Sequence, residues 1–70
     1  MNSTILEGKW TELKGRLRSQ WGRLTDDDLD EIQGDAEILI GKLQQRYGHA
    51  KDRIRKEVDD WLSEQHAGLE

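Results

Sequence analysis

The sequence predicts an all-α domain of four short helices, and three observations support this fold class. The chain has 70 residues and no proline, so no residue type in it forbids a helix interior. Its apolar residues recur at spacings of three and four, the period of a helix with one buried face. Glycines and capping residues fall between these segments and separate them. No strand is expected.

An internal repeat indicates how these helices are arranged. Residues 13–22 reappear, nearly unchanged in pattern, as residues 39–48. A unit this short cannot bury its apolar face alone, so two copies are expected to pack as similar helical hairpins. We expect one domain over residues 1–70, with its core between about 8 and 62. The glycines that match at the same spacing are Gly8, Gly15 and Gly22 in the first copy and Gly34, Gly41 and Gly48 in the second.

The first helix is expected from Thr4 to about Trp21, with Ser3 as its N-cap. Gly22 follows at the position where helices commonly end in left-handed backbone. The apolar residues of this segment fall on one narrow stripe, which is predicted to face the core: Leu6, Trp10, Leu13, Leu17, Trp21 and Leu24.

The second helix is expected to begin at Thr25 and stop at Gly34. Thr25 offers a capping hydroxyl, and Asp26–Asp28 place negative charge at the positive end of the helix dipole. Leu29 and Ile32 are predicted to point inward. The residues at both ends of this short helix are therefore interpreted as helix start and stop signals.

The third and fourth helices complete the predicted fold. Asp35 can cap the third, Gly48 closes it, and the fourth runs from about His49 to Gln65. Residues 66–70 are expected to fray, and Leu69-Glu70 resembles a cloning remnant. The predicted core positions are Ala36, Leu39, Leu43 and Tyr47, with Ile40 at the margin, then Ala50, Ile54, Val58, Trp61 and Leu62.

Charge is strongly segregated along the chain, although the net charge is only −4. Residues 9–23 carry +4, residues 26–37 carry −7, residues 42–56 carry +5 and residues 57–64 carry −4. The interpretation we favour is that basic and acidic helices neutralise each other within the domain. The alternative is a basic face that binds an anionic partner.

The composition predicts no enzyme, no cofactor and no metal site. There is no cysteine, and the two histidines are far apart in sequence. Asp26, Asp28, Asp30 and Glu37 fall at ligand positions of a calcium loop, but Glu31 stands where that loop needs glycine. The chain also has no apolar run that could cross a membrane or serve as a signal peptide, so a cytoplasmic protein with no membrane partner is expected.

Three glycines lie opposite the apolar stripes, inside predicted helices. A glycine in a helix interior costs about 1 kcal/mol relative to alanine, which is large for so small a domain. The interpretation we favour is that another backbone of the domain crosses closely there. The alternatives are a docking strip for a partner helix or a deliberately labile helix. These glycines are Gly8, Gly15 and Gly41.

The four aromatic residues also fall on the apolar stripes. Aromatic rings beside arginines can stack on nucleic-acid bases. However, the chain has no phenylalanine, so these rings are the largest groups available to fill a core. A core role is therefore predicted for Trp10, Trp21, Tyr47 and Trp61.

Several motifs resemble the CsbD-like family of small bacterial stress proteins, over about residues 8–62. They are Gly8-Lys9-Trp10, Lys14-Gly15-Arg16, Trp21-Gly22-Arg23-Leu24-Thr25-Asp26-Asp27-Asp28, Gly34, Gly41-Lys42-Leu43-Gln44 and Arg46-Tyr47-Gly48. The resemblance implies a SAM-like arrangement of two packed helical hairpins and expression in general stress or stationary phase. It implies no catalytic residue and no cofactor.

Two functional hypotheses follow. The first is a non-catalytic stress-response protein that acts by protein contact or protection, with Gly8, Gly15 and Gly41 as its contact face, and as a monomer or weak dimer. The alternative is a nucleic-acid-binding module that grips phosphates through its basic helices. Its contacts would be Lys14, Arg16, Arg18, Lys42 and Arg46.

Overall fold

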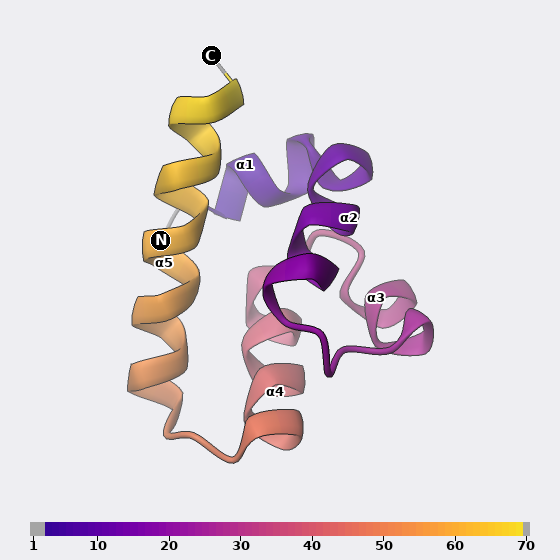
Figure 1. The fold of residues 1–70 in the computed structure, drawn as a ribbon, viewed down its shortest axis with the longest axis vertical. Coiled ribbons are helices and arrows are strands. Elements are labelled where there is room, and N and C mark those ends of the chain that lie inside the picture. The colour runs from indigo at the N-terminus through magenta and orange to yellow at the C-terminus, as the bar shows by residue number, and fades with distance from the viewer. Residues whose placement is uncertain (1–2, 70) are drawn as a thin grey trace.

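Helices account for nearly all of the chain in the computed structural model, which describes the backbone of residues 3–69 and the side chains of residues 6–65. Over this range there is no strand. The helices are α1 (Ser3–Gly8), α2 (Trp10–Gln20), α3 (Asp26–Ile32), α4 (Ala36–Tyr47) and α5 (Lys51–Leu69). Figure 1 shows α5 along one side of the molecule, with α4 beside its lower half and α1 crossing near its upper half.

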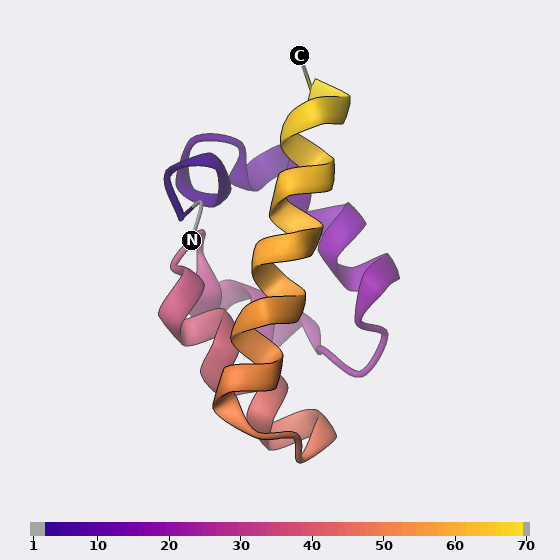
Figure 2. The ribbon, with the colours of Figure 1, turned by 90° about the vertical axis from the view of Figure 1, so that its left-hand side faces the viewer.

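The prediction of a single first helix is wrong, because the chain turns at Lys9. Lys9 has φ −119° and ψ 23°, outside the helical region, and a new helix begins at Trp10. Gly8, the poorest helix former in the segment, directly precedes this turn. The turn directs α1 across α5, as Figure 2 shows from the side, and allows Leu6 to be fully buried. The side chain of Ser3, the expected N-cap, lies outside the described residues.

The region ends where it was predicted to end, near Trp21, but the prediction of a left-handed Gly22 is wrong. The last residue of α2 is Gln20, and its C-cap is Trp21, whose backbone has φ −124° and ψ 82° and whose N–H donates to the Leu17 carbonyl. The Leu24 N–H then donates to the Trp21 carbonyl at 3.1 Å and forms the following turn. Burial of the Trp21 side chain holds this arrangement, so a left-handed glycine is not required.

The predicted caps of α3 and α4 are confirmed. Thr25 and Asp28 form a reciprocal capping box at the start of α3, and the Asp35 carboxylate accepts from two backbone N–H groups at the start of α4. Gly48 closes α4 in left-handed backbone, with φ 72°. However, α3 ends at Ile32, and its C-cap is the left-handed Gln33 rather than Gly34.

The last helix begins later and runs further than predicted. It starts at Lys51 rather than His49 and continues past Gln65 to Leu69. Ala50, predicted to be a core residue, is exposed. Its carbonyl accepts from the N–H of Ile54, so Ala50 lies at the helix start, where its methyl group is directed away from the packed face. Glu70 lies outside the described residues.

The core lies between all five helices, and the sequence predicted it well. Trp21 and Trp61 pack edge to face, with ring centroids 5.3 Å apart, and Trp10 and Tyr47 pack partly buried at its margin. The core role of the aromatic residues is therefore confirmed. The buried apolar residues are Leu6, Leu13, Leu17, Trp21, Leu24, Leu29, Ile32, Ala36, Leu39, Ile40, Leu43, Ile54, Val58, Trp61 and Leu62.

The fold class is all-α as predicted, but residues 3–69 form five helices rather than four. The most extensive helix contact is between α4 and α5, and α3 packs on α4 while α1 packs on α2 and α5. The SAM-like arrangement of two hairpins stays a prediction. Within the described range, no helix is both long enough and apolar enough to cross a membrane.

Candidate functional site

The glycines singled out from the sequence lie on three different helices. Gly8 ends α1, Gly15 lies within α2 and Gly41 lies within α4. A Cβ atom added at any of these positions would meet no atom within 4 Å. The prediction that another backbone crosses at these glycines is therefore wrong, and the space beside each one is open.

A close backbone crossing does exist, but at Gly34. A Cβ atom there would lie 3.0 Å from the Cα atom of Glu7 and 3.3 Å from the carbonyl oxygen of Leu6. Gly34 also has φ +85°, a conformation that residues with a Cβ atom rarely adopt. The loop between α3 and α4 therefore passes directly against α1, and it needs glycine for two reasons.

Gly15 borders a hollow between α2 and α3, which we call the Gly15 hollow. Its volume is about 370 Å³, and it is open to solvent. A neighbouring hollow of about 200 Å³ is lined by Gly8 and shares Thr11 with it, whereas Gly41 lines neither. Two of the three glycines are thus brought near each other. The Gly15 hollow is lined by Thr11, Lys14, Gly15, Arg18, Ser19, Asp26 and Leu29.

The lining of the Gly15 hollow suits contact rather than chemistry. The Ser19 hydroxyl donates to the Gly15 carbonyl at 3.2 Å, so it is engaged with its own helix. Leu29 is buried and offers an apolar base. Lys14 is half-buried at the wall, and no ion pair joins it to another side chain of residues 6–65. These groups can pack against a partner and attract a carboxylate.

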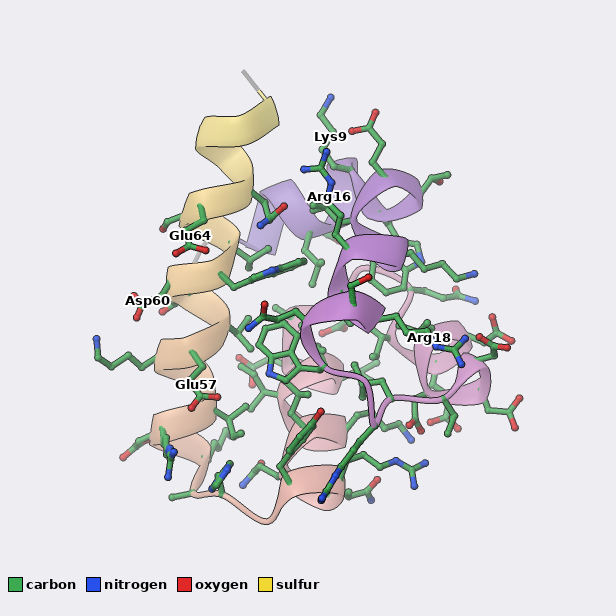
Figure 3. All side chains as sticks on the ribbon, viewed as in Figure 1. Lys9, Arg16, Arg18, Glu57, Asp60 and Glu64 are labelled. Carbon is green, nitrogen blue, oxygen red and sulfur yellow. The ribbon has the colours of Figure 1, made fainter. Side chains whose placement is uncertain are left out.

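Three of the five predicted phosphate-binding side chains pair with acids of α3. Arg18 pairs with Asp26, as Figure 3 shows where Arg18 reaches over α3. Lys42 pairs with Glu31, and Arg46 binds Asp28. The intramolecular interpretation of the segregated charge is therefore confirmed for α3 and its neighbours.

The other two predicted phosphate contacts, Lys14 and Arg16, also lie on α2 but make no ion pair with α3 within the described range. Arg16 donates from Nη1 to Oε1 of Gln65 at 3.1 Å and so connects α2 to α5, while Lys14 lines the Gly15 hollow. The structure does not bring the five bases together on one surface.

Asp28 is the buried polar residue of the core, whereas the sequence analysis placed it only among the acids that favour the start of the second helix and in the rejected calcium-loop pattern. Its side chain accepts from Nε of Arg46 at 2.8 Å and from Nη2 at 3.0 Å, while its Oδ2 accepts from the Thr25 N–H at 3.0 Å. The residue is 3% exposed. The hydrogen bonds from Arg46 hold the pKa of Asp28 well below its ordinary value, despite the opposing effect of burial.

A sequence signal for this ion pair was present. Thr25 and Asp28 have the spacing of a capping box, which predicts that the carboxylate turns back toward the chain. Lys42 and Arg46 are one helical turn apart, so both lie on one helix face. A carboxylate that turns inward needs a positive partner, and this face provides two. Asp26 and Asp28, two carboxylates of the calcium-like pattern, are thus both bound to arginines.

Comparison with known proteins places the chain in a family. A family model described as CsbD-like matches residues 4–56. The chain belongs to the CsbD-like family. UPF0337 protein RPA4217 of Rhodopseudomonas palustris is 57% identical over 63 residues, covering 90% of this chain and 96% of its own length.

Two further relatives agree. UPF0337 protein PA4738 of Pseudomonas aeruginosa is 52% identical over 61 residues, covering 87% of this chain and 94% of its own. UPF0337 protein YjbJ of Escherichia coli is 49% identical over 61 residues, covering 87% and 88%. No solved structure matches the chain.

The motifs that resemble the CsbD-like family have structural roles in this chain. Trp21 and Leu24 are core residues, and Thr25 caps α3. Tyr47 accepts from the N–H of Arg23 at 3.2 Å, and Gly48 closes α4. These motif positions are therefore explained by folding. Gly8, Gly15, Gly22 and Gly41 are motif glycines with open space around them and no left-handed backbone, and of these Gly15 and Gly41 lie within a helix.

Proposed function

We propose that this CsbD-like protein is a non-catalytic stress-response protein that acts by protein contact, through the Gly15 hollow. The resemblance that pointed to the family implies expression in general stress, and the family match over residues 4–56 supports that context. The partner that suits the hollow is a helix of another protein that carries acidic side chains.

Gly15 is the observation that carries this proposal. A glycine in a helix interior lowers stability by about 1 kcal/mol. In a domain of this size, whose core supplies about 3–5 kcal/mol, that is a substantial loss. Within the part of the chain that the structure describes, no atom lies within 4 Å of where a Cβ atom of residue 15 would stand, so the missing side chain serves no packing there. A backbone without a side chain beside an open hollow allows a partner helix to approach closely. Lys14 lines the same hollow and can form ion pairs with carboxylates of that helix.

The titratable groups of the domain also favour contact over catalysis. A general acid needs a pKa raised toward neutrality. Asp28, the buried carboxylate, has its pKa lowered by Arg46, so it stays ionised and serves the ion pair. Of the two hydroxyl residues that line the hollow, Thr11 and Ser19, the latter is hydrogen-bonded to backbone.

The proposal is tested by filling the hollow and measuring protection. A folded model enzyme with an acidic helical surface is heated gradually in the presence of the wild-type protein, and the onset of aggregation is followed by light scattering. We expect suppression by the wild type and its loss in Gly15→Gln, which puts a polar side chain into the hollow. Ser63→Gln, an exposed change on α5, is the matched control and should protect normally. Equal protection by both variants would contradict a role for the hollow.

The nucleic-acid alternative stays a prediction, and a titration decides it. Three of the five bases already bind carboxylates of α3, so phosphate would have to displace those acids. Tryptophan fluorescence is followed during titration with duplex and single-stranded DNA at low and moderate salt. Saturable binding with a steep salt dependence would favour this alternative over protein contact.

A further inference from the structure

A second groove lies between α2 and α5, away from the Gly15 hollow. It has a volume of about 210 Å³ and is open to solvent. We call it the tryptophan groove. Its floor is aromatic, because Trp21 and Trp61 pack edge to face there, with only 6% of each residue exposed. The described residues that line the groove are Gln20, Trp21, Glu57, Asp60, Trp61 and Glu64.

One wall of the tryptophan groove is acidic. Glu57 and Glu64 are separated by seven residues, close to two helical turns, so they share one face of α5. Figure 3 shows them one above the other on the near side of α5, with Asp60 at its outer edge. The opposite wall comes from α2 and provides Gln20, which is neutral. The groove therefore has negative charge on one side, and no base of the described range lines it.

These acids are available to a partner. Among residues 6–65, the structure shows no ion pair to Glu64. Arg16 reaches α5 at Gln65 rather than at Glu64. Glu57 pairs with Arg53 at 3.3 Å, but this pair joins successive turns of α5 at the surface. Because surface pairs of this kind contribute little, a base of a partner can replace Arg53.

The two tryptophans bring hydrogen-bond donors to the floor of the groove. No residue of the 6–65 range accepts a hydrogen bond from the indole N–H of Trp21 or Trp61. Neither indole nitrogen is sealed inside the protein, so both open into the groove that the two residues line. A donor on an almost buried side chain lowers stability while it lacks an acceptor. These N–H groups therefore favour a ligand that brings acceptors.

We propose that the tryptophan groove binds an extended basic segment of another protein. Arginines at alternate positions of this segment bind Glu57 and Glu64, and its backbone carbonyls accept from the two indole N–H groups. Alternate side chains of an extended chain lie on one side of it, about 7 Å apart. Glu57 and Glu64 lie about 10 Å apart along α5, and the long arginine side chains span the difference. Arginine suits these acids because its guanidinium binds a carboxylate with two parallel hydrogen bonds.

Other charged ligands satisfy only part of the groove. A nucleic acid brings hydrogen-bond acceptors, but its phosphates are repelled by the acidic wall. A linear polyamine brings positive charge, but it has no acceptor for the indole N–H groups. A basic peptide segment brings both and so complements the wall and the floor together.

The groove is small and its charges are exposed, which sets the character of this binding. Exposed charges carry much of the attraction, and salt therefore weakens it. The proposal goes beyond the function assigned to the Gly15 hollow, which is lined from α2 and α3 and suits an acidic partner. The two surfaces therefore have opposite preferences and can be tested separately.

The first test is a titration of the full chain with a blocked tetrapeptide that has arginine at its first and third positions and alanine elsewhere. Tryptophan fluorescence is followed at about 20 mM and about 500 mM salt. We expect saturable binding at low salt that weakens about fivefold or more at high salt. The absence of saturable binding at low salt, up to millimolar peptide, would overturn the proposal without any variant.

Two further ligands separate this recognition from simple attraction of charge. A tetrapeptide with arginine at its first and second positions has the same charge, but it directs the two side chains to opposite sides. A linear diamine also has the same charge and has no carbonyl group. Both are expected to bind more weakly than the first peptide. Equal affinity for either of them would overturn the proposal.

Paired variants test the acidic wall itself. Glu57→Gln/Glu64→Gln removes its two carboxylates and should weaken binding of the first peptide about fivefold. Asp27→Asn/Asp30→Asn removes the same charge from exposed positions of α3, and this matched control should bind like the wild type. Gly15→Gln should also bind normally, because the Gly15 hollow is a separate surface. Equal weakening by the two double variants would show an effect of net charge alone and overturn the proposal.

Indole N–H signals in NMR spectra locate the bound peptide directly. On titration at low salt, the Trp21 and Trp61 indole signals and the Gln20 side-chain signal should move. Trp10 lines a different hollow, so its indole signal is an internal reference that should stay in place. Movement of the Trp10 signal without the other two would place the peptide on another face and contradict the proposed groove.

Discussion

The two copies of the internal repeat have similar sequences but lie in different structural environments. Both form a helix, α2 from the first copy and α4 from the second, and both have an open glycine in the middle, Gly15 or Gly41. Their flanking glycines diverge. Gly34 is held against α1 in left-handed backbone, whereas its counterpart Gly8 simply ends α1 with open space around it.

The ends of the two helices differ in the same way. Trp21 closes α2 by burial against Trp61, and Gly22 needs no special conformation. Its counterpart Tyr47 is only half-buried, and Gly48 must turn left-handed to close α4. The comparison teaches that the shared residues define the helix, while tertiary packing decides what each equivalent end residue does.

The basic residues diverge as well. Lys42 and Arg46 of the second copy bind acids of α3, and the buried Asp28 receives both hydrogen bonds from Arg46. Arg16, the counterpart of Lys42, reaches α5 instead. Both copies therefore use bases within the domain, but only the second copy binds the buried Asp28, and only the first reaches α5.

The largest effect is expected from alanine at the two counterpart glycines. Gly34→Ala forces a Cβ atom into left-handed backbone and against α1, which should lower the free energy of unfolding by about 2–4 kcal/mol. Gly8→Ala should be neutral or stabilising, because its surroundings are open and alanine favours helix. Urea denaturation measures both. Equal changes in unfolding free energy for Gly34→Ala and Gly8→Ala would contradict the different roles assigned to the two glycines.

The buried carboxylate comes next. Asp28→Asn removes the charge that Arg46 binds and weakens the cap of α3, so we expect a loss of about 2 kcal/mol in unfolding free energy. Asp30→Asn, an exposed change on the same helix, is the control and should be nearly neutral. A loss no larger than that of the control would show that the pair does not stabilise the fold.

The same residue predicts how stability depends on pH. The folded pKa of Asp28 lies below that of the unfolded chain, where an aspartate titrates near pH 4. Its contribution is therefore complete above about pH 5 and is lost as the pH falls through 4 and below. Unfolding free energies measured from pH 7 to 3 should fall more steeply for the wild type than for Asp28→Asn. Parallel curves would contradict this assignment.

The smallest effect on the free energy of unfolding is expected at the contact between Arg23 and Tyr47. The Tyr47 hydroxyl accepts from the Arg23 N–H at 3.2 Å, and the Arg23 guanidinium lies 5.3 Å from the ring centre. Tyr47→Phe keeps the ring and loses only the hydroxyl, so a loss of about 0.5 kcal/mol is expected. Hydrogen exchange at the Arg23 amide should quicken. An effect as large as that of Asp28→Asn would mean that this contact is central rather than marginal.

Most of the fold could be predicted from the sequence because local signals were strong. The caps at Thr25, Asp35 and Gly48 follow from local chemistry. The apolar period identified the buried apolar residues, although it placed the fully buried Ile40 at the margin and assigned the exposed Ala50 to the core. The turn at Lys9 was missed, because it depends on what α1 packs against rather than on its own residues.

The candidate site was less predictable for the same reason. A helical wheel placed Gly15 and Gly41 on an outer face, but it could not show whether another backbone crosses there. That crossing occurs at Gly34, where Leu6 and Glu7 approach from a distant part of the chain. The pairing of Arg46 with Asp28 is likewise tertiary, although both residues were recognised individually.

The most direct test of the account is the free energy of unfolding of Gly15→Ala/Gly41→Ala, measured by urea denaturation beside the wild type. The account holds that the fold has no use for either glycine, so alanine should raise the free energy by about 1 kcal/mol at each position, additively. An unchanged or lower value would show that the bare backbone at these positions serves the domain itself, and would contradict the assignment of the Gly15 face to a partner.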